Sequence, residues 1–320
     1  MKVFITHVTE NYEEAAINLA ISIKKYSKYP LIVYTINYEG SPELNSLATC
    51  KQITLDIPPL TSDDIETSNQ GLIYVNRQTF RTYKVLGAKV ECMLDITKLG
   101  ATWVYLDSDC IVNTNIDSLF DYESLITDFP IAPPSPYQFL IIPHKNLPHR
   151  GNPFWKEDGS FDETVTLEYP LMQFLGTQNR KEYVVTCTVL GNKNCLEFIK
   201  LWKDIKNLLP RLNNDLTWYT PFHEETIYNC LAWKKPNYTH LPRIFINIQG
   251  VEGVIHYLNH PFNGEEFLSG MHVDPQTGEK MPGFLSYPGS KNDVRIFHGE
   301  KRKSEADKIF KILDQIKLDN

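Results

Sequence analysis

Residues 102–112 read TWVYLDSDCIV. The first five residues are bulky, apolar or β-branched, which is typical of a strand buried in a parallel sheet. The run stops at two acids, Asp107 and Asp109, with one residue between them. Ligands of open α/β sheets bind beyond the carboxyl ends of the strands, and carboxylate oxygens bind divalent cations well. The segment therefore predicts an α/β fold with an acidic site where a central strand ends.

The same three residues also have an ordinary structural interpretation. Either aspartate could cap a helix or close a turn through its own backbone, and the tripeptide alone favours that explanation. Strand alternation would instead send Asp107 and Asp109 to the same side, where two carboxylates repel unless a cation lies between them. Evidence from the rest of the sequence is needed to distinguish a turn from a metal site.

The first 115 residues alternate between strand and helix patterns. Apolar strands are expected at 3–8, 31–36 and 52–57, a loop at 58–76, and helices at 11–29 and 77–94. The first helix has Asn11 as its expected N-cap, acids in its first turn and lysines in its last, and it ends at Pro30. Repeated β-α units of this kind indicate parallel strands joined by right-handed crossovers, which is a Rossmann-like architecture.

Regular strand and helix patterns are sparser near the middle of the chain. Seven prolines occur between Pro130 and Pro153, so loops are expected there. Further on, the periodicity predicts strands at 183–190 and 244–248 and helices at 195–209, 224–233 and 304–318. The loops of the proline-rich segment could shape a binding cleft at the rim of the sheet.

Bulk composition narrows the class of protein. The chain has 320 residues and a formal charge of -7, and this net charge argues against a general nucleic-acid binder, which needs excess Lys and Arg. The six cysteines form no Cys-x-x-Cys pair, which favours a reducing compartment. No segment approaches the ~20 apolar residues of a membrane span. The N-terminus reads as a strand and not as a signal peptide, so a cytoplasmic protein without stable membrane insertion is expected.

Four separated segments resemble the motifs of GT-A-type glycosyltransferases, and among these the motifs of glycosyltransferase family 8. They are VTENY at 8–12, DSD at 107–109, EETIYN at 224–229 and HGEK at 298–301. They are similar, in order, to the family's Asp-Asn-Tyr loop, its Asp-x-Asp metal motif, its Asp-Gln-x-x-x-Asn segment and its late His-x-x-Gly-x-x-Lys motif. The match is not exact: Thr9 or Glu10 stands where the Asp of the first motif is expected, and the last motif is shortened.

The resemblance implies a GT-A-type, Rossmann-like mixed sheet flanked by helices. It implies one domain over residues 1–303, with a nucleotide-sugar-binding half at 1–125 and an acceptor half at 126–303, followed by a helical tail at 304–320. It also implies a metal-dependent transferase that moves a hexose from a nucleotide sugar, UDP-linked, to a hydroxyl of a glycan or other acceptor, with retention of configuration. Two alternatives stay open: a sugar-nucleotide nucleotidyltransferase, although the first loop has no glycine-rich segment, and a carbohydrate- or nucleotide-binding protein without turnover.

The site residues follow from the resemblance and from their positions. Mn²⁺ or Mg²⁺ is expected on Asp107, Asp109 and His298. The substrate-binding residues are expected to be Thr6, His7, Val8, Asn11, Tyr12, Arg81, Lys84, Asp107, Ser108 and Lys301. Glu224 and Glu225 are the expected catalytic residues, on the sugar side. Ordinary explanations exist for three of these groups: His298 could be a turn histidine, Lys301 part of a solvated basic run, and the two glutamates a complement to a helix dipole.

Overall fold

The computed structural model of the chain describes residues 1–57, 80–112, 114–134, 169–212, 223–242, 245–247, 266–273, 280–286 and 296–298. Two predicted elements lie wholly outside this range, the loop at 58–76 and the C-terminal helix at 304–318. The proline-rich segment, the helix predicted at 77–94 and the strand predicted at 244–248 lie partly outside it.

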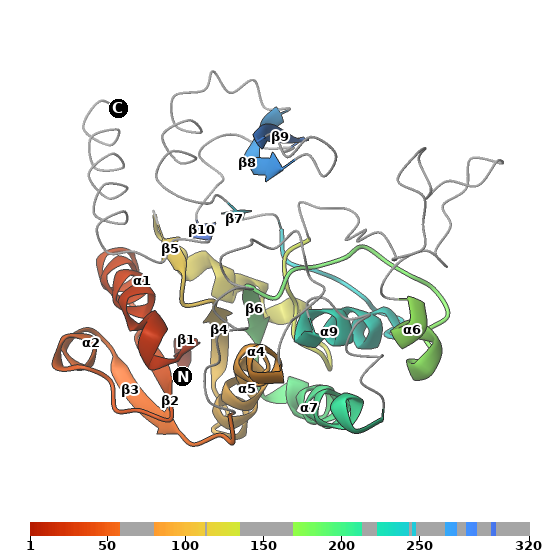
Figure 1. Cartoon of the computed structure of the whole chain (residues 1–320), viewed down its shortest axis with the longest axis horizontal. Coiled ribbons are helices and arrows are strands. Elements are labelled where there is room, and N and C mark those ends of the chain that lie inside the picture. Colours follow the sequence, from red (N-terminus) through yellow and green to blue (C-terminus); the bar gives the residue numbers. More distant parts are fainter. Residues whose placement is uncertain are drawn as a thin grey trace.

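A mixed sheet forms the centre of the described part (Figure 1). Its five strands run in the order β3-β2-β1-β4-β6, with β1 at Lys2–Val8, β2 at Leu31–Ile36, β3 at Thr49–Ile53, β4 at Thr102–Leu106 and β6 at Thr188–Gly191. The first four strands are parallel, and β6 runs antiparallel to β4. The predicted α/β class with a mixed sheet is confirmed.

Helices cover both faces of this sheet (Figure 1). In the described ranges, the helices and 3-10 helices are η1 at Glu10–Tyr12, α1 at Glu13–Tyr26, α2 at Pro42–Leu47, α4 at Phe80–Leu86, α5 at Ala88–Lys98, η3 at Asp117–Leu125, α6 at Tyr169–Leu175, η5 at Lys193–Cys195, α7 at Leu196–Leu212 and α9 at His223–Trp233. Phe4 of β1 contacts Phe120 of η3 on one face, with ring centroids 5.2 Å apart, and His7 bonds to Val85 of α4 on the other. This follows from the alternation of side chains along a strand.

A smaller sheet lies beyond the end of β4. It is formed by β5 at Cys110–Val112, β10 at Ile296–His298 and β7 at Phe245–Asn247, in the order β5-β10-β7. A separate hairpin pairs β8 at Glu266–Val273 with β9 at Lys280–Ser286. Strand β10 therefore brings residues from the end of the sequence next to the segment that follows β4.

The pairing of β4 with β6 requires a glycine. Gly191 lies opposite Trp103, whose indole is fully buried. A Cβ at Gly191 would lie 2.3 Å from Cζ2 of that ring, so any larger residue would force the indole or the strand to move.

Several boundaries differ from the sequence prediction for local reasons. The third strand lies at Thr49–Ile53 and not at 52–57, because the side chain of Asn37 bonds to both the N–H and the C=O of Leu55, each at 2.8 Å, where the ladder ends. The first helix begins at Glu13, and Asn11 does not cap it: Asn11 Oδ1 accepts a bond from the Thr9 hydroxyl at 2.9 Å.

The helix predicted at 77–94 is two helices that meet at Gly87. The carbonyl of Gly87 accepts a bond from the buried ammonium of Lys206 at 3.0 Å. A Cβ at Gly87 would lie 2.6 Å from Cδ of that lysine, so the glycine lets α7 approach. The strand predicted at 183–190 is shorter, because Asn229 of α9 takes both backbone bonds of Val184, each at 2.9 Å.

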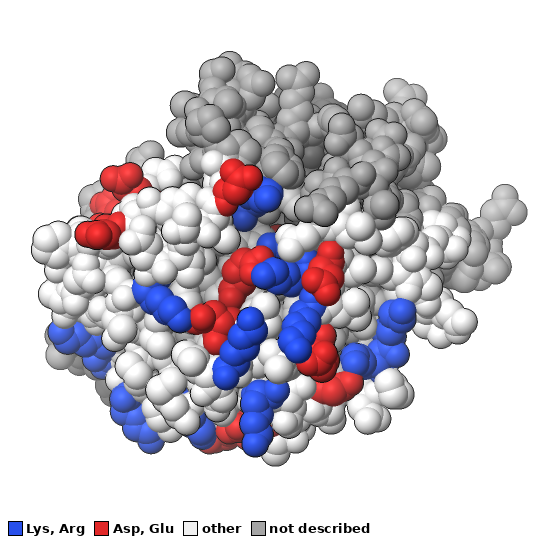
Figure 2. Space-filling view, turned by 90° about the horizontal axis from the view of Figure 1, so that it is seen from below, with Lys and Arg blue, Asp and Glu red and all other residues white. Residues whose placement is uncertain are grey.

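The face seen in Figure 2 carries both signs of charge side by side. Lys51 lies 2.6 Å from Asp95, and Lys203 lies 2.6 Å from Glu91. In the described part of the chain, no helix is long and apolar enough to cross a membrane.

Candidate active site at the end of strand β4

The order of the strands marks one place on the sheet edge as a binding crevice. Strand β1 lies between β2, which follows it in the sequence, and β4. The order therefore reverses between β1 and β4, and crevices in open α/β sheets form at such a reversal, beyond the carboxyl ends of the strands. Asp107 directly follows β4, and Val8 ends β1.

Asp107 lies at the start of a tight turn. The amide of Cys110 donates to the carbonyl of Asp107 at 3.1 Å, so Ser108 and Asp109 occupy the corner of the turn. The turn interpretation is thus right for the backbone, and strand alternation does not apply to Asp109. The carboxylate of Asp107 has a different environment, because its Oδ1 accepts a bond from the Tyr105 hydroxyl at 2.8 Å.

Strand β10 runs beside this turn. His298 lies opposite Cys110 in the antiparallel register, one residue from Asp109. The chain therefore brings the three expected metal ligands into one region from positions about 190 residues apart in the sequence. Among the described residues, no group of three or more His, Cys, Asp and Glu side chains is arranged to hold a metal ion.

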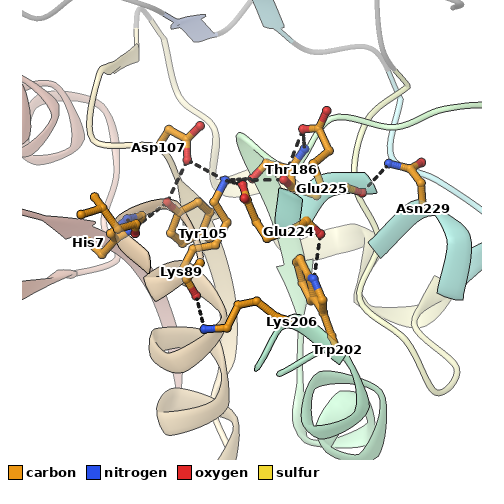
Figure 3. A network of polar contacts seen from close by, with 12 residues as sticks. His7, Lys89, Tyr105, Asp107, Thr186, Trp202, Lys206, Glu224, Glu225 and Asn229 are labelled. Carbon is orange, nitrogen blue, oxygen red and sulfur yellow. Dashed lines mark hydrogen bonds and ion pairs between the residues drawn. The ribbon is translucent and has the colours of Figure 1, made fainter. Parts of the chain in front are cut away.

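One buried cation joins the end of β4 to the start of α9. The Lys89 ammonium lies 3.2 Å from Asp107 Oδ1 and 3.1 Å from Glu224 Oε1, and the Lys89 side chain is only 4% exposed. It also donates to the carbonyl of Thr186 at 3.4 Å. Figure 3 shows Lys89 between Asp107 on one side and Glu224 and Thr186 on the other. A lysine in the first turn of α5 opposes the helix dipole, so these acids are what stabilise its charge.

Glu224 and Glu225 are both buried in the first turn of α9. Glu225 Oε2 accepts a bond from the Thr186 amide at 2.8 Å. Glu224 Oε2 is buried and has no hydrogen-bond partner within the described ranges. The helix-dipole explanation is therefore incomplete, because both carboxylates reach side chains or amides of other elements.

Burial sets the protonation of these groups. Burial, together with the nearby Lys89 ammonium, lowers the pKa of His7 to about 4. Burial by itself would lower the pKa of Lys89, but the charges of Asp107, Glu224 and Glu225 outweigh it, so this pKa lies well above its ordinary value. Burial raises the pKa of Glu225 to about 7. The lysine is therefore charged at neutral pH, whereas His7 is neutral.

The raised pKa of Glu225 predicts a pH dependence of stability. The folded protein binds more protons than the unfolded chain between the ordinary carboxyl pKa and about 7, so this residue's contribution to the free energy of unfolding falls as pH rises through that window. Glu225→Gln should remove this dependence, which amounts to about 2–3 kcal/mol between pH 5 and pH 8 at 1.36 kcal/mol per pKa unit. Urea unfolding of both proteins at the two pH values measures it. If the free energies of unfolding of the two proteins changed equally with pH, Glu225 would not be the source of the dependence. His7 has the opposite pH effect, but it is present in both proteins and cancels in the comparison.

The residues expected at the nucleotide lie around the end of β1. Thr6, His7 and Val8 are buried within that strand. Asn11 and Tyr12 follow in η1, where Asn11 is exposed and Tyr12 is partly exposed. A ligand at this edge would therefore meet the side chains of η1 and the backbone of β1.

The basic residues expected at the phosphates are divided. Arg81 and Lys84 belong to α4, and Lys84 is partly exposed. Ser108 is partly exposed in the turn after β4. Lys301 lies outside the described residues.

The sequence prediction missed Lys89, Tyr105 and Thr186. Lys89 could have been found, because it lies on the same stripe of α5 as the buried Cys92, Met93 and Ile96. A charged residue on an apolar stripe indicates a buried functional or paired group.

The sequence matches no protein-family model and no curated protein. The structure is similar to that of an active-site mutant of LgtC, with a TM-score of 0.50 and 13% identity, over 99% of this chain and 96% of that chain. It is also similar to mouse xyloside xylosyltransferase 1 in its apo form, with a TM-score of 0.46 and 13% identity, over 93% and 98% of the two chains. At this identity the likeness concerns the fold alone. The chain has the mixed α/β fold of GT-A glycosyltransferases, as its resemblance to family 8 predicted.

Proposed function

We propose that the protein is a metal-dependent glycosyltransferase that moves a hexose from a UDP-linked sugar to a hydroxyl of a glycan or other acceptor, with retention of configuration. The observation that carries the proposal is the position of Asp107. It lies where the strand order reverses, and its carboxylate is fixed there by a tyrosine and a buried lysine. A partly exposed carboxylate at such a reversal is well placed to hold the divalent cation that accompanies an anionic ligand.

The residue types at this edge are ones that divalent cations prefer. Asp107 and Asp109 are partly exposed and offer hard oxygen ligands, and the register of β10 puts the backbone of His298 beside them. Carboxylates with one imidazole suit Mn²⁺, and carboxylates alone suit Mg²⁺. When bound, the ion would neutralise the charge that develops on the departing diphosphate.

The residues of the chain itself would bind and orient the donor and the acceptor. Asn11 and Tyr12 are proposed to contact the nucleotide, and Lys84 its phosphates. Glu224 is proposed to accept a hydrogen bond from a hydroxyl of the donor sugar. Its Oε2 is buried without a partner in the described residues, and such an acceptor gains from a hydrogen bond. Residues 1–125 would then form the donor half and residues 126–303 the acceptor half of one domain.

A panel of nucleotide sugars tests the proposal. We expect UDP-sugars with Mn²⁺ to raise the melting temperature, and UDP to be released slowly from one of them even without an acceptor, because water can replace the hydroxyl. A ligand at 100 times its Kd stabilises a protein by about 2.7 kcal/mol, which is readily seen in a thermal shift. Stabilisation by UDP and Mn²⁺ without release of UDP or transfer from any donor would instead indicate a binding protein. No stabilisation by any nucleotide would overturn both.

A further inference from the structure

The Tyr105 hydroxyl has two competing partners. It lies 2.8 Å from Asp107 Oδ1 and 2.8 Å from His7 Nδ1. Tyr105 is fully buried, and its ring stacks on that of His7 with centroids 5.9 Å apart and planes 25° apart. Figure 3 shows the hydroxyl between the imidazole and the carboxylate. A buried hydroxyl held in this way has few other orientations.

The number of protons does not match the number of contacts. His7 Nε2 lies 3.1 Å from the carbonyl of Val85, which can only accept, so Nε2 carries the proton of the neutral imidazole. Nδ1 is then a bare acceptor. The carboxylate of Asp107 also only accepts. The hydroxyl has a single proton, so at any moment it donates either to His7 or to Asp107.

Neutral His7 is what the surroundings favour. The ring is buried on the same face of the sheet as the Lys89 ammonium, and burial with this charge lowers its pKa to about 4. An imidazolium there would have to be desolvated next to another cation. The two-acceptor arrangement is therefore the state at neutral pH.

We propose that His7 is a positioning residue for Asp107: it is the alternative acceptor to which the Tyr105 hydroxyl donates when a divalent cation binds the carboxylate. The inference rests on the metal site of the proposed function. It gives His7 an indirect role in place of the substrate contact expected from the sequence.

The change of hydrogen-bond partner matters because Asp107 Oδ1 already contacts two donors. It accepts from Tyr105 and pairs with Lys89, and each donor withdraws electron density that a cation would use. Rotation of one O–H bond toward His7 removes one of these donors without moving a heavy atom or a charge. Without an acceptor at residue 7, the tyrosine hydroxyl would continue to donate to Asp107.

Two substitutions at His7 separate this role from simple packing. His7→Leu keeps much of the volume and offers no acceptor, whereas His7→Asn keeps an oxygen close to the place of Nδ1. Both variants lose the hydrogen bond to the carbonyl of Val85, so this loss does not contribute to the difference between them. We expect the Kd for Mn²⁺, measured by electron paramagnetic resonance without any nucleotide sugar, to rise about tenfold in His7→Leu, as for other partners of metal ligands, and to stay within about threefold in His7→Asn.

Tyr105→Phe supplies a second test that needs no change at His7. It removes the contested proton, so Mn²⁺ should bind at least as tightly as in the unmodified protein. Adding His7→Leu to Tyr105→Phe should then have no further effect on the Kd. A Kd raised tenfold by Tyr105→Phe, or losses that add in the double variant, would mean that the two residues only maintain the fold.

The outcomes distinguish this inference from the function on which it rests. If the unmodified protein binds Mn²⁺ and His7→Leu binds it equally well, His7 does not position Asp107, and the proposed transferase is unaffected. If the unmodified protein does not bind Mn²⁺, both proposals fail.

Discussion

Asp109→Asn is expected to lower the rate of sugar transfer by about 10²–10³-fold, because a metal ion that loses a charged ligand loses several kcal/mol of charge stabilisation. Asp109 lies at the corner of the turn after β4 and is partly exposed. Asparagine suits such a turn as well as aspartate does. The free energy of unfolding should therefore change by less than about 0.5 kcal/mol. Transfer rates and urea unfolding of the same preparation measure the two effects.

Asp121→Asn is the matched control. Asp121 is exposed on η3, so the same loss of charge occurs away from the sheet edge. Its transfer rate should equal that of the unmodified protein. If Asp109→Asn kept the unmodified rate and the unmodified dependence on Mn²⁺, Asp109 would not be a metal ligand.

Lys89→Met is expected to lower the free energy of unfolding by about 3–5 kcal/mol, the usual cost of removing one partner of a buried ion pair. Asp107 and Glu224 lie on either side of the ammonium, and Glu224 is only 4% exposed. Methionine fills the space and leaves the charge of Glu224 buried and uncompensated. Equilibrium unfolding in urea measures the loss.

The exposed pair of Lys51 and Asp95 supplies the control. Its atoms are closer, at 2.6 Å, but the two side chains are 44% and 37% exposed. Solvent screens such a pair, so Lys51→Met should cost about 0–1 kcal/mol. Equal losses in the two variants would show that burial of Lys89 does not decide its contribution.

Strands with strong local patterns could be predicted well from the sequence. Leu31–Ile36 has the predicted bounds, and the run before Asp107 forms β4. Each is a short apolar segment with a helix-breaking residue or a pair of acids at one end, and its hydrophobic burial does not depend on one distant partner. Helices α7 and α9 were predicted for the same reason, within three residues at each end.

Predictions failed where a distant side chain ended an element. Asn37 ends the ladder at β3, and Asn229 occupies the backbone of Val184, so neither boundary is written in the local periodicity. Gly87 looked like one residue of a continuous helix. Its role became visible only with Lys206 packed against it.

The site shows the same division. The acids at 107 and 109 stood out because two carboxylates after an apolar strand need an explanation. Lys89 and Tyr105 did not, since a lysine in a helix and a tyrosine in a strand are common. Their importance comes from contacts between different elements: Lys89 pairs with Glu224, 135 positions away, and Tyr105 bonds to His7, 98 positions away.

The sequence by itself determined the class of fold and the acidic end of the central strand, because periodicity, turn residues and paired charges act over a few neighbouring positions. The tertiary structure decided which groups surround Asp107. Only the parallel alignment of β1 with β4 brings His7 to Tyr105, and only the packing of α5 and α9 on the sheet puts Lys89 between two carboxylates. Burial then fixes the charge of these groups, since the cost of desolvation depends on the surroundings that the folded chain provides and not on residue type alone.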